Sequence, residues 1–92
     1  MSEMTLPYRV TPVFDQDSLP DALRKAHDTR TDTWGIIRVL EGLLRYVIAE
    51  SMTEQILMPG RPGLINPGQR HFVEPIGPMR MQVEFYDAPP PL

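Results

Sequence analysis

Two histidines, His27 and His71, are the side chains of this sequence best suited to metal chemistry. The chain of 92 residues contains no cysteine, so disulfides, thiolate catalysis and cysteine-ligated zinc or iron–sulfur sites are excluded. Neutral imidazole together with a carboxylate suits borderline divalent cations such as zinc. Because 44 positions separate the two histidines (71 − 27), only the fold can bring them to one site.

Two carboxylates, Glu74 and Glu84, are candidates to complete such a site. Glu74 follows His71 by three residues, and residues three apart in a strand point to opposite faces unless a bulge intervenes. Glu84 belongs to the polar face of the alternating stretch 79–86. If that face points into a pocket, we expect Glu84 rather than Glu74 to be the third ligand. If it points to solvent, Glu84 is only a surface acid. For Glu74 and Glu84 alike, a solvated carboxylate is the commoner case.

The apolar stretch 34–49 contains one tryptophan and two arginines that could contact a ligand. Trp34 begins this stretch, and a tryptophan in such a run is more often part of a core than a platform for a ligand. Arg38 and Arg45 lie in its two halves, where solvated positions on an outer face are expected. The alternative is that one of the two arginines points inward and holds an anion.

Composition and motifs weigh against several classes of function. The sequence has no Gly-x-Ser-x-Gly elbow and no phosphate-binding glycine loop. A net charge of −3 and scattered arginines argue against a nucleic-acid partner. No apolar run reaches the roughly 18 residues of a membrane span. Because residues 1–5 also lack the pattern of a signal peptide, we expect a cytoplasmic protein without membrane contact.

The chain predicts an all-β fold built from short strands. Eleven prolines and six glycines divide it into seven or eight short stretches, with turn signals about every ten residues. This pattern is typical of a sandwich or barrel, and we expect a closed or nearly closed barrel with at most one short helix near residues 19–25. We expect a single domain over residues 1–92, with the barrel at 8–88 and tails at 1–7 and 89–92.

Two hairpins are predicted to organise this fold. One turns at residues 41–42, within the apolar stretch 34–49. The other turns at residues 67–68, where a Pro-Gly pair forces a tight reversal and delivers His71 to the mouth of the sheet. The last strand, 79–86, alternates strictly and therefore gathers its large apolar side chains on one face: Met79, Met81, Val83 and Phe85.

Several short motifs resemble a known family. The stretch Leu64-Ile-Asn-Pro-Gly-Gln-Arg-His71 resembles the second cupin motif, in which a Pro/Gly turn delivers a metal-ligating histidine into a β-barrel. The stretch Val39-Leu-Glu-Gly-Leu-Leu-Arg-Tyr46 resembles the hairpin that ends the first cupin motif. More narrowly, residues 8 to 88 are similar to the small cupin-like family related to the N-terminal part of tellurite-resistance protein B. This resemblance rests on Leu19-Pro20, His27-Asp-Thr29, Thr33-Trp-Gly35, Glu41-Gly42, Pro67, His71 and Val83-Glu-Phe-Tyr86.

The resemblance implies a cupin-like double-stranded β-helix, a jelly-roll barrel, with a site lined by His27 and His71. It also implies a role in tellurite, oxyanion or stress resistance. We expect the two histidines to bind a divalent metal, zinc or a similar ion, in the barrel mouth, with Glu84 or Glu74 as a third ligand. A small-molecule or oxyanion ligand has its own candidate contacts: Arg38, Arg45, Trp34 and Tyr46.

Three functions remain open at this point. The chain is a metal- or small-ligand-binding protein, a metal-dependent oxygenase or isomerase, or a non-catalytic dimerising regulatory module. An enzyme needs a base that the sequence does not identify, so catalysis is left undecided. We expect a homodimer, because an edge strand interrupted by Pro12 and a hydrophobic content of 41% leave apolar surface to cover in so small a domain.

Overall fold

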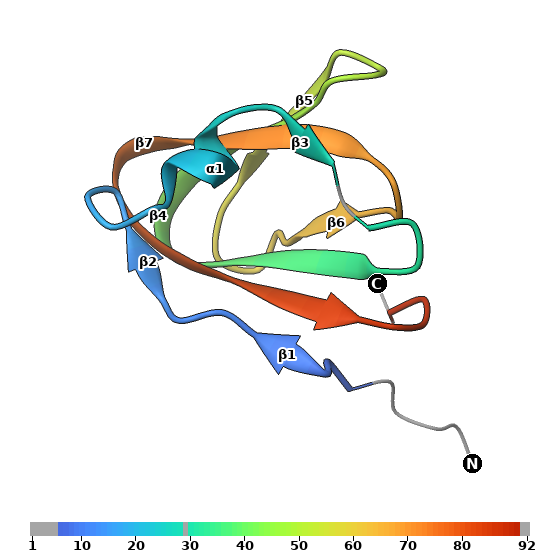
Figure 1. Ribbon diagram of the computed structural model, residues 1–92. Coiled ribbons are helices and arrows are strands. Elements are labelled where there is room, and N and C mark those ends of the chain that lie inside the picture. Colours follow the sequence, from blue (N-terminus) through green and yellow to red (C-terminus); the bar gives the residue numbers. More distant parts are fainter. Residues whose placement is uncertain (1–5, 29, 91–92) are drawn as a thin grey trace.

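The computed structural model describes residues 6–28 and 30–90, and this part of the chain is mostly β-sheet with one short helix (Figure 1). The predicted all-β class and the position of the short helix are therefore confirmed. No helix in the described residues is long and apolar enough to cross a membrane. The elements in chain order are β1 (Arg9–Val10), β2 (Phe14–Asp15), α1 (Asp21–Arg24), β3 (His27–Asp28), β4 (Trp34–Ile48), β5 (Thr53–Leu57), β6 (Gly63–Ile65) and β7 (Arg70–Tyr86).

Two long antiparallel strands, β4 and β7, form the centre of the fold. They pair from Trp34↔Tyr86 to Ile48↔His71, with register shifts on either side of Glu41. At these irregularities both strands bend sharply, as the curve of β7 at the left of Figure 1 shows. Bulges of this kind re-aim a strand without ending it. The predicted turn at residues 41–42 is therefore wrong, because the chain bends there within one strand.

The bend divides the sheet into two layers that face each other. The first layer contains the start of β4 and the end of β7, with β6 beside β4 and with β1 and β2 beside β7. The second layer contains the other halves, with β5 beside β4 and β3 beside β7. Strands that pass from one layer to the other through bulges are the usual corners of orthogonal sandwiches.

The second predicted hairpin is also wrong in its pairing. β6 pairs with β4 through Gly35↔Ile65, whereas the residues that follow the turn pair with β4 and β3 in the other layer. Residues 66–69 do form a tight turn, in which the Gln69 amide donates to the Asn66 carbonyl at 3.1 Å. That turn carries the chain from one layer to the other, and Gly68 takes the positive φ of +71° that it needs.

The sheet is open in its strand pairing. Its order is β1-β7-β4-β5, and among residues 6–28 and 30–90 no pairing joins β1 to β5. The closed barrel that the sequence suggested is therefore corrected to an open sheet folded back on itself. The sheet stays open because β4 and β7 pair with each other on both sides of the bend, and the strands beside them are short.

The space between the layers holds the hydrophobic core. The last strand alternates as predicted over residues 79–83, since Met79, Met81 and Val83 are buried on its inner face while Arg80 is exposed. At its end the pattern departs from the prediction, because Phe85 is only half-buried and Tyr86, expected on the polar face, is buried. Burial of such side chains is the main favourable contribution to folding, at about 25 cal/mol per Å² of apolar surface. The core cluster comprises Leu19, Ile37, Val39, Leu44, Tyr46, Leu57, Ile65, Val73, Met79, Met81 and Val83.

Candidate functional site

A cavity of about 350 Å³ lies between the two layers. This volume is within the range of small-molecule sites in proteins. Its apolar walls come from both layers and from the short helix. The lining residues are Tyr8, Arg9, Thr11, Leu23, Arg30, Thr33, Ile37, Ile65, His71, Val73, Met81, Val83 and Phe85.

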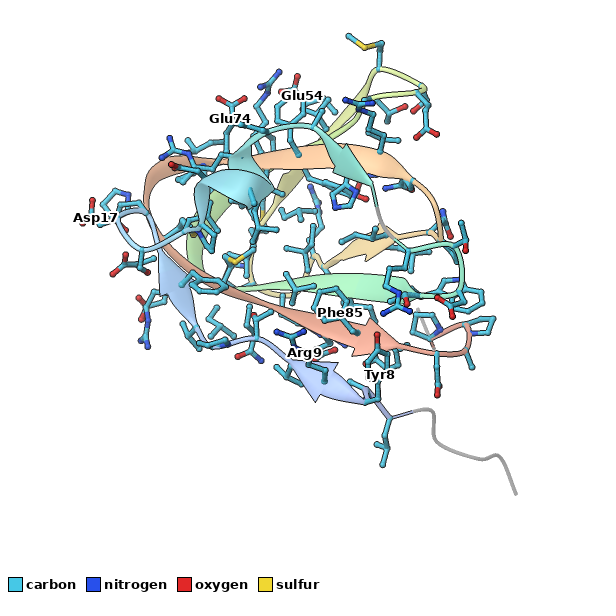
Figure 2. All side chains as sticks on the ribbon, in the orientation of Figure 1. Tyr8, Arg9, Asp17, Glu54, Glu74 and Phe85 are labelled. Carbon is cyan, nitrogen blue, oxygen red and sulfur yellow. The ribbon has the colours of Figure 1, made fainter. Side chains whose placement is uncertain are left out.

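Most of the polar lining residues lie at one end of the sandwich, which we call the open end. Here β4 begins and ends, and here β7 begins and ends, opposite the bend. Arg9 lies at this end because it is the register partner of Phe85, and Figure 2 shows Tyr8, Arg9 and Phe85 close together. Arg30 is held beside the turn of residues 66–69, since its carbonyl accepts the Gly68 amide at 3.2 Å.

His71 is a buried polar residue of the cavity wall, with 4% of its surface exposed, and Thr33 is another, with 6% exposed. Its Nδ1 lies 3.0 Å from the Gln69 carbonyl oxygen. Because a carbonyl only accepts, Nδ1 carries the hydrogen, and in the neutral ring Nε2 is then the unprotonated nitrogen. This tautomer is the one that can accept a hydrogen bond or ligate a metal through Nε2.

Tyr46 supports His71 from the core side rather than lining the cavity. The two rings meet edge to face, with centroids 6.0 Å apart and planes at 80°. The Tyr46 hydroxyl donates to the Leu64 carbonyl at 2.7 Å and accepts from the Gln69 side-chain amide. Burial raises the pKa of Tyr46 to about 12, although the Gln69 hydrogen bond acts in the opposite direction. Tyr46 was predicted as a ligand contact, and the structure gives it a packing role.

The backbone brings the two histidine positions together. β3 pairs antiparallel with β7, and His27 is the register partner of His71. The side chain of His27 lies outside the described part of the structure, so the shared metal site stays a prediction. Among the described side chains, no group of three or more histidines and carboxylates stands close enough to hold a metal ion.

The predicted acidic ligands do not join His71 on its face of β7. His71 and Val73 are buried on the inner face, while Glu74 forms an ion pair with Arg45. Glu84 accepts from the Arg38 Nε at 3.2 Å and from the Tyr86 hydroxyl at 2.9 Å. Neither carboxylate is among the residues that line the cavity.

The predicted ligand contacts Arg38, Arg45 and Trp34 also lie away from the cavity lining. Arg45 donates to Glu54 as well as to Glu74, and the hydrogen bond that Glu54 accepts is the main cause that raises the pKa of Arg45. The structure therefore matches the expectation that Arg38 and Arg45 belong to the outer face. Trp34 is half-buried beside Tyr86 at the open end.

Sequence reasoning missed the two arginines that do line the cavity. Arg9 stands in a stretch interpreted only as an edge strand, and Arg30 stands in a polar loop. The pairing Arg9↔Phe85 supplies the missing information, because directly opposite residues share one face of the sheet. Since Phe85 was expected on the inner face, a correct register for the first strand would have found Arg9.

Comparison with known proteins identifies the family. The TehB-like domain profile matches residues 9–83. The chain belongs to the TehB-like domain family. It is 38% identical over 39 residues to the protein named probable S-adenosyl-L-methionine-dependent methyltransferase TehB from Haemophilus influenzae, which is 42% of this chain and 14% of that protein.

Two crystal structures share the fold of this TehB-like domain. TehB from Haemophilus influenzae superposes with a TM-score of 0.83 at 28% identity, covering 95% of this chain and 32% of that chain. A protein from E. coli strain K12 superposes with a TM-score of 0.82 at 17% identity, covering 97% and 96% of the two chains. The predicted relation to tellurite-resistance protein B is confirmed, and this chain spans about a third of the TehB chain. The cupin assignment stays a prediction.

Proposed function

We propose that this TehB-like domain is a ligand-binding module that takes a small molecule into the cavity between its two layers. The observation that carries the proposal is the cavity itself, with about 350 Å³ of space and a mostly apolar lining. Sites for small molecules commonly combine a preformed apolar hollow with a few converging polar groups. Here those polar groups are His71 in the wall and Arg9 and Arg30 near the open end.

The family relation suggests the setting in which such a module acts. A relative is named a probable S-adenosyl-L-methionine-dependent methyltransferase, and this chain covers only 14% of it. We therefore assign recognition to the TehB-like domain and methyl transfer to the part of such proteins that this chain does not cover. A link to tellurite resistance follows from the same relation, with an oxyanion or an organic product of its metabolism as the ligand class.

Binding in the cavity is tested with labelled protein and simple probes. Sodium tellurite and the neutral probe 1-octanol are titrated separately into ¹⁵N-labelled protein, and the amide resonances of Val73 and Val83 are followed. A Leu23→Trp variant narrows the cavity from the helix side and is expected to weaken binding. A Leu40→Trp variant, at an exposed site away from the lining, is the matched control. Unchanged cavity resonances with every probe would contradict the proposal.

A divalent metal is the second candidate ligand, because the register places His27 opposite His71. Residues directly opposite in an antiparallel pair have Cβ atoms roughly 4.5–5.5 Å apart, which is within reach of one shared ion. The hydrogen bond from His71 Nδ1 to the Gln69 carbonyl is the kind of outer contact that orients a ligating imidazole. We propose zinc bound through the two imidazoles, with water rather than Glu74 or Glu84 completing the sphere.

Zinc titration into metal-free protein tests this second candidate. His27→Ala and His71→Ala are expected to abolish binding, whereas Glu84→Gln and Glu74→Gln leave it unchanged. Affinity falls from about pH 7.5 to about pH 5.5, because both imidazoles must be neutral to ligate and histidine titrates near 6.5. Equal affinity in the wild type and both alanine variants excludes the site. Metal binding alone does not distinguish a binding protein from a metal-dependent enzyme. Only a measured turnover would establish the enzyme.

A further inference from the structure

We propose that the ligand of this cavity is an organic anion, with an apolar body between the layers and its negatively charged group at the open end beside Arg9 and Arg30. The inference rests on the proposed ligand-binding function and adds the chemical class of the ligand. Three features of the described residues support it: the apolar walls, the cationic entrance and the balance of charge around the cavity.

The walls favour an apolar body. Most of the lining side chains are hydrocarbon or thioether: Leu23, Ile37, Ile65, Val73, Met81, Val83 and Phe85. A volume of about 350 Å³ corresponds to about a dozen water molecules at roughly 30 Å³ each. An inorganic oxyanion, only a few waters in size, would leave most of these walls unfilled, and apolar contact that excludes water supplies much of the affinity in such sites.

The entrance is marked by residues shared between the cavity and a neighbouring depression. Tyr8, Arg30 and Thr33 line both hollows, so they stand where the cavity meets the surface. Arg9 lines the cavity at the same end, on the strand that pairs with Phe85. A ligand group at this entrance therefore lies near two arginine residues, both of which are also exposed to water.

Charge selects the sign of that group. The chain carries a net charge of −3, yet the described lining residues include two arginines and no carboxylate. Asp32 and Asp87 belong only to the outer depression. The Arg30 Nε lies 3.8 Å from the Asp32 Oδ1, and both side chains are largely exposed. A surface ion pair of this kind contributes little free energy. A bound carboxylate can therefore compete for Arg30, and the planar guanidinium suits two-point contact with it.

Calorimetric titration with three probes of equal chain length tests the charge directly. Octanoate, 1-octanol and octylammonium carry the same apolar body with negative, neutral and positive head groups. We expect octanoate to bind at least about tenfold more tightly than 1-octanol, as one charge-assisted contact provides. Raising NaCl from about 0.05 M to about 0.5 M should weaken octanoate only, because exposed charges are screened over this range.

Three variants complete the experiment. Arg9→Gln and Arg30→Gln are each expected to weaken octanoate about tenfold and to leave 1-octanol unchanged. Arg61→Gln removes the same charge outside the lining and is the matched control. If all three probes bind equally, or if either cavity variant binds octanoate as the wild type does, the anion proposal is wrong while cavity binding stands. If no probe binds, the proposed function fails with it.

Discussion

One buried hydroxyl, that of Tyr46, joins three segments at the open end. It comes from β4, donates to the Leu64 carbonyl on β6, and accepts from Gln69 in the turn that leads to β7. Its ring also packs against His71, so Tyr46 both connects the two layers and contacts a polar residue of the cavity wall. A hydrogen-bonded core tyrosine of this kind specifies where the turn sits, because its partners are buried and lose their contact if the turn moves.

Replacement of Tyr46 by phenylalanine is expected to lower the free energy of unfolding by about 1–2 kcal/mol at neutral pH. The reason is that the Leu64 carbonyl and the Gln69 amide lose a partner away from bulk water. Urea denaturation measures the loss. Tyr8→Phe removes an equivalent hydroxyl from an exposed tyrosine and should cost no more than about 0.5 kcal/mol. Similar losses in the two variants would show that the buried hydroxyl is not stabilising.

Stability should also depend on Tyr46 at alkaline pH. Burial raises the pKa of Tyr46 from 10.0 to about 12, so the folded state favours the neutral phenol. The resulting contribution is complete below about pH 10 and is lost as the pH rises toward 12, with a ceiling of about 3 kcal/mol. Wild type should therefore lose stability faster than Tyr46→Phe above pH 10. Urea denaturation from pH 7 to pH 11 checks this, and parallel curves for the two proteins would contradict it.

At the scale of the element, the bend in β4 and β7 depends on a close approach at Gly42. This residue has a φ of +76°, and a Cβ built on it would lie 2.2 Å from the Pro78 carbonyl oxygen. Gly77 also has a positive φ, of +68°, but a Cβ there meets nothing within 4 Å. The two glycines share a backbone requirement, and only Gly42 adds a steric one.

Gly42→Ala is therefore expected to cost at least about 3 kcal/mol, and Gly77→Ala about 1 kcal/mol. The loss is larger at Gly42 because alanine there has to adopt a left-handed backbone conformation and its Cβ also pushes the paired strands apart. Thermal or urea denaturation of both variants measures the difference. Equal losses would mean that the backbone conformation alone matters and that the strands can separate at the bend without penalty.

The same bend shows how far the sequence predicts these elements. Strict alternation assigned the inner face of β7 correctly over residues 79–83, because period-two patterning is local, but it did not predict that Tyr86 is buried. Glu41-Gly42 could not be assigned in this way, since a glycine with positive φ serves a hairpin turn and a bulge equally well. Only the pairing with β7 on both sides of Gly42 distinguishes them, and pairing is a long-range property.

The candidate site shows the same division. The two histidines were chosen by residue type, and the fold then set them in register across β3 and β7. The carboxylates lie on the opposite face of β7 from His71, and their arginine partners could not be read from spacing along the chain. Arg9 and Arg30 carry no local signal at all, because their place at the open end comes from pairing and turn contacts.

At the scale of the whole molecule, the exposed apolar surface of the described residues gathers near the start of the chain. Among residues 6–28 and 30–90, half of the exposed large apolar side chains lie in residues 6–13, which include the edge strand β1: Leu6, Tyr8, Val10 and Val13. Exposed patches of this kind are typical of contact surfaces. Pro12 prevents a continuous ladder along this edge, so we expect contact through side chains rather than a shared sheet.

We predict that two copies associate through this N-terminal edge. A dimer with two-fold symmetry would place the same patch of each copy against the other and cover both at once. Analytical ultracentrifugation at about 50 µM, above the dissociation constant of ordinary dimers, should give twice the monomer mass of 10.5 kDa. Val10→Lys combined with Val13→Lys should yield a monomer, because association would bury two charged ammonium groups and removing them from water costs free energy. Leu40→Lys, at an exposed site on β4, should remain dimeric. A monomeric wild type, or a dimer that survives both lysines, would show that this edge faces solvent.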